Sequence, residues 1–187
     1  MGSNFANFFF AALNSRRGKI VFTHVPKPYM RGALVVRTQM TTIVKITDLE
    51  LDSLQALRAE SSREGFRFME RLCDEWASGA NRFNHPGEAL FLAIAEGLVV
   101  GICGLNRDPY ATAPLIGRVR RLYVLRAYRR SGVGRALLDA VIAHARGHFK
   151  LLRVRTEAAG DFYATHGFRR DASDAEATHV LELTHAA

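Results

Sequence analysis

Short apolar runs separated by polar turns recur along the chain after residue 40. Runs rich in Val, Ile, Leu and Phe predict strands at 41–46, 89–95, 98–105, 119–125 and 151–156. The second and third of these runs are apolar almost throughout and are separated by Glu96-Gly97. A short link containing Gly favours an antiparallel hairpin. Continuous apolar strands indicate the centre of a sheet that is covered on both faces.

Helical spacing appears between these runs. Thr47 is followed three residues later by Glu50, a pattern typical of a capping box, and it predicts a helix that begins there. The apolar face of this helix is expected to be Leu51, Leu54 and Leu57. After a pause at 61–65, a second helix is predicted to end at Gly79. Its expected buried positions are Phe66, Phe68, Leu72 and Trp76.

The C-terminal half continues the mixed pattern. Helices are predicted at 137–145 and, as a short turn, at 158–166. Closing strands are expected near Phe168 and at 179–183. The alternation of strands and helices predicts a mixed α/β layered domain.

Residues 1–39 have a different composition. They contain six Lys and Arg but no Asp or Glu, so they supply six of the formal net charge of +8 and leave +2 for 40–187. Their apolar run at 4–13 is shorter than the roughly 20 residues of a membrane span, and its basic residues follow it, unlike those of a secretory signal. We expect a disordered basic extension, or sequence upstream of a start at Met40. A targeting or nucleic-acid-binding tail is the alternative.

The remaining composition narrows the class of protein. With 48% hydrophobic and 24% charged residues in a chain of 187, one folded domain over 40–187 is expected. The two cysteines, Cys73 and Cys103, lie far apart in the sequence and lack metal-ligand spacing. We therefore expect no disulfide framework, no metal site and no membrane association, and a cytoplasmic location.

The strand at 119–125 runs into a turn rich in Arg and Gly, and a helix follows. Gly132 and Gly134 would let the backbone approach a ligand closely. The free N–H groups at the start of a helix bind phosphate, and neighbouring arginines strengthen that field. The turn lacks the Gly-Lys-Ser/Thr of a P-loop and the third glycine of a dinucleotide fingerprint. On the glycines alone, a solvated strand-to-helix turn is an equal alternative.

Two motifs in order make the pattern more specific. Arg129-x-x-Gly132-x-Gly134, after a strand that contains RLYV, resembles the acyl-CoA signature of the GNAT superfamily of N-acetyltransferases. The segment FYATHGF, within 161–168, resembles the C-terminal motif of the superfamily, in which a helix carries a Tyr toward the CoA sulfur. The order of elements resembles the family over about four-fifths of the chain. Asp161 departs from the pattern, since relatives more often carry an apolar or basic residue there.

This resemblance implies a fold, a co-substrate and a set of binding residues. The fold would be a GNAT-like mixed, mostly antiparallel central sheet with a splayed parallel pair of strands and helices on both faces. Acetyl-CoA would be the acyl donor, with its pantetheine arm against the strand backbone and its pyrophosphate on the turn. The expected cofactor-binding residues are Leu122, Tyr123, Val124, Arg129, Arg130, Ser131, Gly132, Val133, Gly134 and Arg135.

The resemblance also implies a catalytic role for Tyr163. Its hydroxyl would protonate the CoA thiolate as the tetrahedral intermediate collapses, and a Tyr with a pKa near 10 is protonated at neutral pH. The general base stays open between Glu88, Glu157, His166 and a chain of water molecules. Specificity is expected to come from the first two helices and the loop at 106–114, without a particular acceptor.

The expected activity is acetyl-CoA-dependent transfer to a primary amine of a small molecule, peptide or protein. A nucleic-acid-binding protein that uses the seven arginines of 118–135 is an alternative, although acids elsewhere and the lack of a nucleic-acid motif argue against it. A non-catalytic acyl-CoA sensor is a third, which the intact Tyr163 makes less attractive. Members of the superfamily often form dimers, but no surface pattern in the sequence shows that this chain does.

Overall fold

The structure is a computed structural model that describes residues 10–11, 22–23, 41–172 and 175–183. Two short strands, β1 (Phe10–Ala11) and β2 (Phe22–Thr23), pair antiparallel. The rest of 1–39 lies outside the described residues, and so does the predicted extension or early start.

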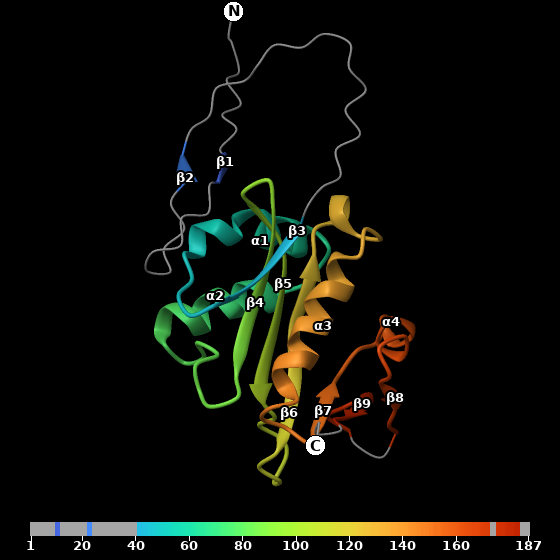
Figure 1. Cartoon of the computed structure of the whole chain (residues 1–187). Helices are drawn as coiled ribbons and strands as arrows, with labels where there is room; N and C mark the ends of the chain where they lie inside the picture. Colours follow the sequence, from blue (N-terminus) through green and yellow to red (C-terminus); the bar gives the residue numbers. More distant parts are fainter. Residues whose placement is uncertain (1–9, 12–21, 24–40, 173–174, 184–187) are drawn as a thin grey trace, which may run out of the picture.

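A seven-stranded sheet forms the body of the protein, in the order β3-β4-β5-β6-β7-β9-β8 (Figure 1). Its strands are β3 (Thr41–Ile46), β4 (Ala89–Ala95), β5 (Leu98–Arg107), β6 (Ile116–Val124), β7 (Leu151–Val154), β8 (Arg169–Arg170) and β9 (His179–Glu182). Of the pairs within this sheet, β6 and β7 are parallel and the others antiparallel. The predicted mixed, mostly antiparallel sheet is confirmed.

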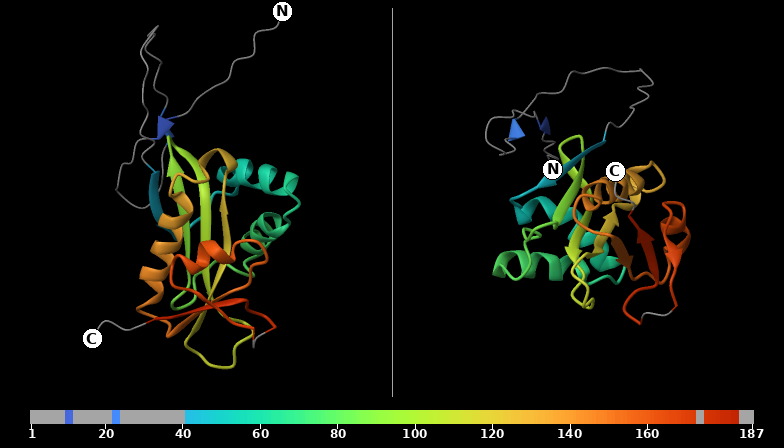
Figure 2. Two further views of the ribbon diagram at one scale, coloured as in Figure 1. Left: turned by 90° about the vertical axis from the view of Figure 1, so that its right-hand side faces the viewer. Right: turned by 60° about the horizontal axis from the view of Figure 1, so that its bottom comes forward.

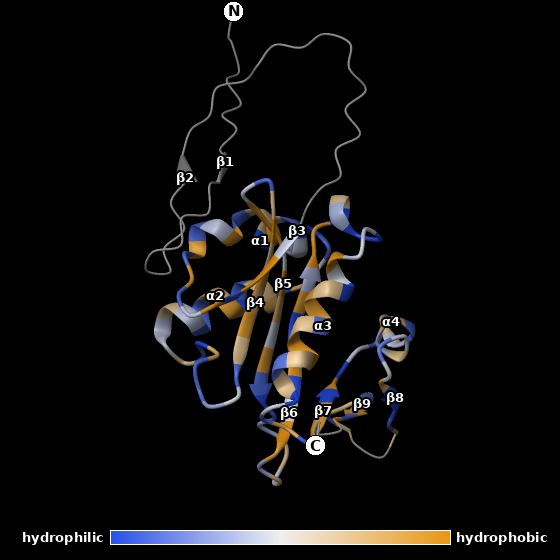
Figure 3. Ribbon diagram, viewed as in Figure 1, coloured by the Kyte–Doolittle hydropathy of each residue, from blue (hydrophilic) through white to orange (hydrophobic). Residues whose placement is uncertain are grey.

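Helices cover both faces of the sheet (Figure 2). One face carries α3 (Val133–Ala145), and the other carries η1 (Leu51–Leu54), α1 (Gln55–Arg63) and α2 (Phe68–Ser78). The turn η2 (Arg126–Tyr128) follows β6, and the short α4 (Gly160–Ala164) follows β7. Each face has its own apolar core, one around α3 and one around α1 and α2. Almost every residue of β4 and β5 is buried between these cores, as their apolar composition predicts (Figure 3).

The predicted turns explain why the central elements begin and end where they do. Glu96 and Gly97 both have positive φ values, 49° and 79°, which suits the tight turn of a two-residue hairpin between β4 and β5. Gly79 ends α2 in the left-handed conformation, with φ 79°. Both predictions are confirmed.

Two predictions about the first helices are wrong. Thr47 and Glu50 do not form a capping box, because Glu50 is itself the extended residue before η1, and no side chain caps that turn. Phe66 is not buried, since 47% of it is exposed. Gly65, with φ 84°, separates α1 from α2, so Phe66 lies in the connection, where its ring contacts Phe68 and Tyr123 while almost half of the residue stays exposed.

The parallel pair separates part of the way along β6. The pairing with β7 covers Ile116, Gly117 and Arg118, whereas β6 continues to Val124. A β-bulge lies just beyond the last paired residue, where Arg121 takes a φ of 61° and the register against β5 shifts around Cys103. A bulge bends a strand and increases its twist, so β6 diverges from β7. This confirms the predicted splayed pair.

A buried carboxylate holds the closed end of this pair together. Arg118 and Arg153 are opposite each other in the last parallel register. Asp108, whose side chain is fully buried, lies 3.4 Å from Nη1 of Arg118 and 3.6 Å from Nη1 of Arg153. Without an acidic partner the two guanidinium groups would repel each other across the strands. Asp108 therefore stabilises the point from which the strands diverge.

Candidate functional site

The predicted phosphate-binding turn joins β6 to the start of α3. Arg130 and Gly132 both adopt left-handed backbone conformations, with φ 64° and 89°. Gly132 is the N-cap of α3, no side chain caps the helix, and the first helical hydrogen bond from this end runs from the Ala136 N–H to the Gly132 carbonyl, 2.9 Å. The amides of the first turn, at 133–135, therefore have no partner within the helix and are available to an anion.

The second glycine of the motif leaves space beside the end of β6. A Cβ on Gly134 would lie 3.7 Å from Cγ2 of Val124 and 3.7 Å from the Phe162 ring. Val124, the first turn of α3 and the Phe162 ring of α4 therefore surround one narrow space. This space adjoins the part of β6 that β7 leaves unpaired.

The three arginines of the motif do not converge on the turn. Arg129 turns back toward α1: its Nε donates to the Val124 carbonyl at 2.9 Å, and its Nη2 donates to Oε2 of Glu64 at 2.6 Å. Arg130 is exposed. Arg135 is 75% exposed and lies 3.8 Å from Asp139 on the next turn of α3. Much of the field at the turn therefore comes from backbone amides, because Arg129 is neutralised by α1.

Two carboxylates, one in α1 and one on the residue that follows it, hold the end of β6, a feature that sequence reasoning missed. Glu60 accepts the Arg126 N–H at 2.7 Å, and Glu64 binds both Arg129 and the Tyr123 hydroxyl, the latter at 3.0 Å. The Arg129 guanidinium also lies 5.2 Å from the Tyr123 ring. The signal in the sequence is the four-residue spacing of Glu60 and Glu64, which places both on one face of a helix. These bonds fix the strand end and the turn relative to α1.

This network predicts a pH-dependent contribution to stability. The hydrogen bond from Arg129, helped by Tyr123, holds the pKa of Glu64 below its ordinary value, against the opposing effect of burial. A carboxyl whose pKa is lowered by folding stabilises the protein above its unfolded pKa, about 4.3, and this stabilisation is lost as the pH falls through the folded value. Glu64→Gln is therefore expected to be less stable than the parent at pH 7, with a difference that shrinks as the pH falls below the unfolded pKa and through the lower folded pKa of Glu64.

Urea unfolding of the full chain at pH 7, 5, 4 and 3 measures this difference. Glu50→Gln is the matched control, because Glu50 is an exposed carboxylate before η1 and loses the same charge. A deficit of Glu64→Gln that stays constant across the whole range contradicts the assignment.

Tyr163 lies on the α3 side of the sheet and is only 5% exposed. Its ring packs between Phe162 and Phe168, with centroids 5.3 Å away in each case. Burial, and then the electrostatic influence of Cys103, raise the pKa of Tyr163 above its ordinary value. Cys103 is the β5 residue opposite the bulge of β6. Tyr163 is therefore a protonated phenol near the bulge, which suits a proton donor and not a base.

The three candidate bases lie apart from one another. Nδ1 of His166 is 2.9 Å from the Phe162 carbonyl, and its Nε2 is 3.7 Å from Asp139, so His166 faces α3. Glu88 precedes β4, where its carboxylate accepts the Arg107 N–H at 3.1 Å. The neighbouring Gly87 packs against residues that follow the C-terminal end of α3, the end opposite the phosphate-binding turn. Glu157 is exposed after β7. The general base remains unassigned.

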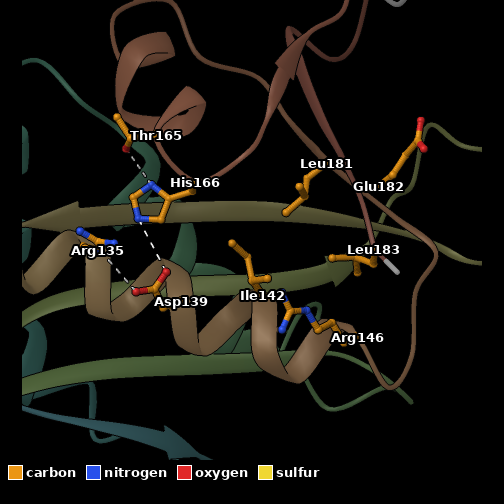
Figure 4. A pocket seen from close by; sticks show the side chains of 9 residues that line it. All are labelled: Arg135, Asp139, Ile142, Arg146, Thr165, His166, Leu181, Glu182 and Leu183. Atoms are coloured by element: carbon orange, nitrogen blue, oxygen red, sulfur yellow. Dashed lines mark hydrogen bonds and ion pairs between the residues drawn. The ribbon is translucent and has the colours of Figure 1, made fainter. Parts of the chain in front are cut away.

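A small polar pocket of about 180 Å³ runs beside α3 (Figure 4). Its lining residues are Arg135, Asp139, Ile142, Arg146, Thr165, His166, Leu181, Glu182 and Leu183. Arg135, Asp139 and His166 gather at one end of it, the end near the start of α3. Of the predicted cofactor-binding residues, Arg135 is the one that lines this pocket.

Three further features concern membrane spans, metal sites and the two cysteines. None of the helices within 41–172 and 175–183 has both the length and the apolar character that a membrane span requires. In the same part of the chain, no three His, Cys, Asp or Glu side chains come together in a way that could hold a metal ion. Cys73 and Cys103 are buried free thiols.

Comparison with known proteins identifies the family. A family model described as the acetyltransferase (GNAT) domain matches residues 86–170. A solved structure from Exiguobacterium sp. 255-15, assigned as an acetyltransferase, is 31% identical, with a TM-score of 0.69, and the match covers 76% of this chain and 93% of that one. An acetyltransferase of the GNAT family from Staphylococcus aureus Mu50 shares the fold at 18% identity, with a TM-score of 0.63 and coverage of 78% and 100%.

No curated protein matches the chain. The Exiguobacterium relative is nevertheless similar over nearly its whole length, and the family model spans the strands from β4 to β8, the turn and the tyrosine helix. The chain belongs to the GNAT family of acetyltransferases.

Proposed function

We propose that the protein transfers the acetyl group of acetyl-CoA to a primary amine. One observation carries this proposal: β6 extends beyond its pairing with β7 and is followed, after η2 and the turn, by the uncapped start of α3, while Tyr163 lies near the bulge within β6. This arrangement offers an open strand edge, an anion site and a proton donor in one row. The pantetheine arm can pair with the open strand edge, and its pyrophosphate can bind at the anion site. The thioester at the other end of the arm then lies near the proton donor.

The co-substrate is held mainly by backbone groups. The pantetheine arm pairs with the strand edge at 122–124, and the amides at 130–134 bind the pyrophosphate. The side chains of Ser131 and Arg130 stay at the rim, where both residues are exposed. Arg129 acts indirectly, because it holds the Val124 carbonyl and Glu64. We assign Arg129 the role of fixing the strand end that the arm pairs with.

The reaction is a direct attack of the amine on the thioester. The amine nitrogen forms a bond to the acetyl carbon, and the tetrahedral intermediate then breaks its carbon–sulfur bond. Tyr163 donates its proton to the leaving thiolate, and the resulting phenolate takes a proton from water before the next turnover, as its raised pKa favours. The amine gives up its proton to a base that the structure leaves unassigned. The acetylated amine and CoA are the products.

Acetyl-CoA binding and turnover by the full chain test this proposal. Calorimetric titration is expected to give a Kd in the micromolar range, and thiol release should accelerate when a primary amine is added. A folded chain that does not bind acetyl-CoA contradicts the proposal. Binding without thiol release from any amine would support the acyl-CoA sensor instead.

A further inference from the structure

Three arginines occur close together on β6, and they differ in their partners. Arg118 is paired with Asp108. Arg121, with a side chain only 4% exposed, is paired with Glu75 at 2.6 Å and donates to the Phe68 carbonyl at 2.9 Å. Arg120 is half-buried, yet no carboxylate within the described residues lies in ion-pair distance of it.

The backbone places Arg120 on the face covered by α1 and α2. Val119 packs in the α3 core, so its neighbour Arg120 points to the opposite face. The bulge then leaves Arg121 on that face as well, where it reaches Glu75 of α2, and Tyr123 packs in the core of α1 and α2. Arg120 also lies beyond the last residue paired with β7, so the strand edge beside it is open.

In the proposed orientation, the acetyl-CoA arm ends next to Arg120. With the pyrophosphate at 130–134, the arm runs back along β6 from Val124 to Leu122. The acetyl group then lies beyond Leu122, two residues and roughly 7 Å of strand from Arg120. The start of α3, and with it the proposed pyrophosphate site, lies on one face of the sheet, which leaves the other face for the acceptor amine. That face carries Arg120.

Arg120 lies near other positive charges. Burial lowers the pKa of Arg121, Glu75 opposes this effect, and the nearby charges of Arg120 and Arg71 lower it further. Glu75 is already bound to Arg121, so it does not neutralise the other two arginines. A half-buried cation without an acidic partner is costly, and a guanidinium is well suited to bind a carboxylate through two hydrogen bonds.

We propose that the acceptor is an amine that also carries a carboxylate, and that Arg120 binds this carboxylate; this rests on the proposed acetyl transfer. Free amino acids and peptides with an acidic group near the amine share this chemistry. In both, the carboxylate on Arg120 directs the amine toward the thioester. Neutral amines of the same size lose this contact and are poorer acceptors.

The test compares matched acceptors with the full chain. Glycine and glycinamide, glutamate and glutamine, and a dipeptide with an acidic or amidated second residue are compared by thiol release from acetyl-CoA. The parent is expected to prefer at least one acid over its amide by tenfold or more in kcat/KM. The pair that shows the preference distinguishes free amino acids from peptides.

Variants assign the preference to one side chain. Arg120→Gln is expected to remove the preference by slowing the acid while the rate with the amide stays the same, and Arg120→Lys should restore part of it. Arg107→Gln is the control, because it removes an exposed positive charge opposite Gly117, in the part of β6 that is paired with β7 and away from the open strand edge. A purely structural role of Arg120 would slow acid and amide alike, and that result overturns the proposal.

Acetyl-CoA binding, measured on the same samples, distinguishes a failure of the proposed acetyl transfer from a failure of the Arg120 assignment. If acetyl-CoA does not bind, the proposed acetyl transfer itself fails. If acetyl-CoA binds and amides are acetylated as fast as acids, or no carboxylate-bearing amine is acetylated, the assignment of Arg120 fails while the co-substrate assignment stands.

Discussion

Replacing Tyr163 with Phe is expected to lower kcat for acetyl transfer by about 100-fold, since a positioned proton donor typically contributes 10²–10⁴-fold. The loss concerns one step: expulsion of an unprotonated thiolate from the tetrahedral intermediate. The Kd for acetyl-CoA should change little, because in the proposed binding mode backbone groups of β6 and the turn hold the arm and the pyrophosphate. Measurement of kcat and of acetyl-CoA binding on the same preparations separates these effects.

The fold should tolerate this substitution. Tyr163 packs between two phenylalanine rings, and a third Phe retains those contacts. Tyr110→Phe is the matched control, because Tyr110 is 59% exposed in the loop after β5, where its ring lies against Arg118 in the part of β6 that is paired with β7. An unchanged kcat in Tyr163→Phe, with intact folding, would show that the thiolate leaves without help from this hydroxyl.

The strands of the sheet could be predicted closely because their signals are local. The expected strands at 41–46 and 89–95 coincide with β3 and β4. Glu96 and Gly97 form the predicted turn, because both adopt the positive φ values that a two-residue hairpin needs. Hydrophobic periodicity and turn chemistry depend on nearest neighbours, which the sequence shows directly.

The site depended on contacts that the sequence does not show. Arg129 belongs to a motif that suggests a phosphate ligand, yet it pairs with Glu64, which is 65 residues away. The bulge at Arg121 has no signal in a run that reads as a regular strand, because a non-Gly residue adopts the positive φ. The predicted capping box is absent because Glu50 has an extended backbone, so the turn of η1 begins one residue after it. A sequence pattern does not show that local conformation.

The two faces of the sheet present different chemical groups at the gap between β6 and β7. The α3 face presents the free amides of the turn and the Tyr163 phenol. The opposite face presents Arg120 among the side chains packed against α2. In the proposed reaction, a thioester in the gap would meet the Tyr163 proton donor from one face and the acceptor from the other. Asp108, by neutralising Arg118 and Arg153, keeps the strands together at the closed end of this gap.

The turn itself is tested by two variants of Gly132 that differ only in charge. Both Asn and Asp adopt left-handed conformations more readily than most residues, so either can replace a glycine with φ 89° at a similar cost in stability. In Gly132→Asp a carboxylate lies beside the amides proposed to bind the pyrophosphate. Like charges about 5 Å apart near a protein surface repel by a few kcal/mol, so acetyl-CoA should bind Gly132→Asp at least about tenfold more weakly than Gly132→Asn.

Salt and a truncated ligand show whether this difference arises at the pyrophosphate. Raising the ionic strength should narrow the difference between Asp and Asn, because exposed charges are screened. S-acetylpantetheine lacks the pyrophosphate, so it should bind the two variants equally, although more weakly than acetyl-CoA. If the two variants bind acetyl-CoA with the same Kd, the pyrophosphate lies elsewhere, and the uncapped amides of α3 are not its site. If S-acetylpantetheine distinguishes them as strongly as acetyl-CoA does, the carboxylate acts on the arm or the strand edge instead.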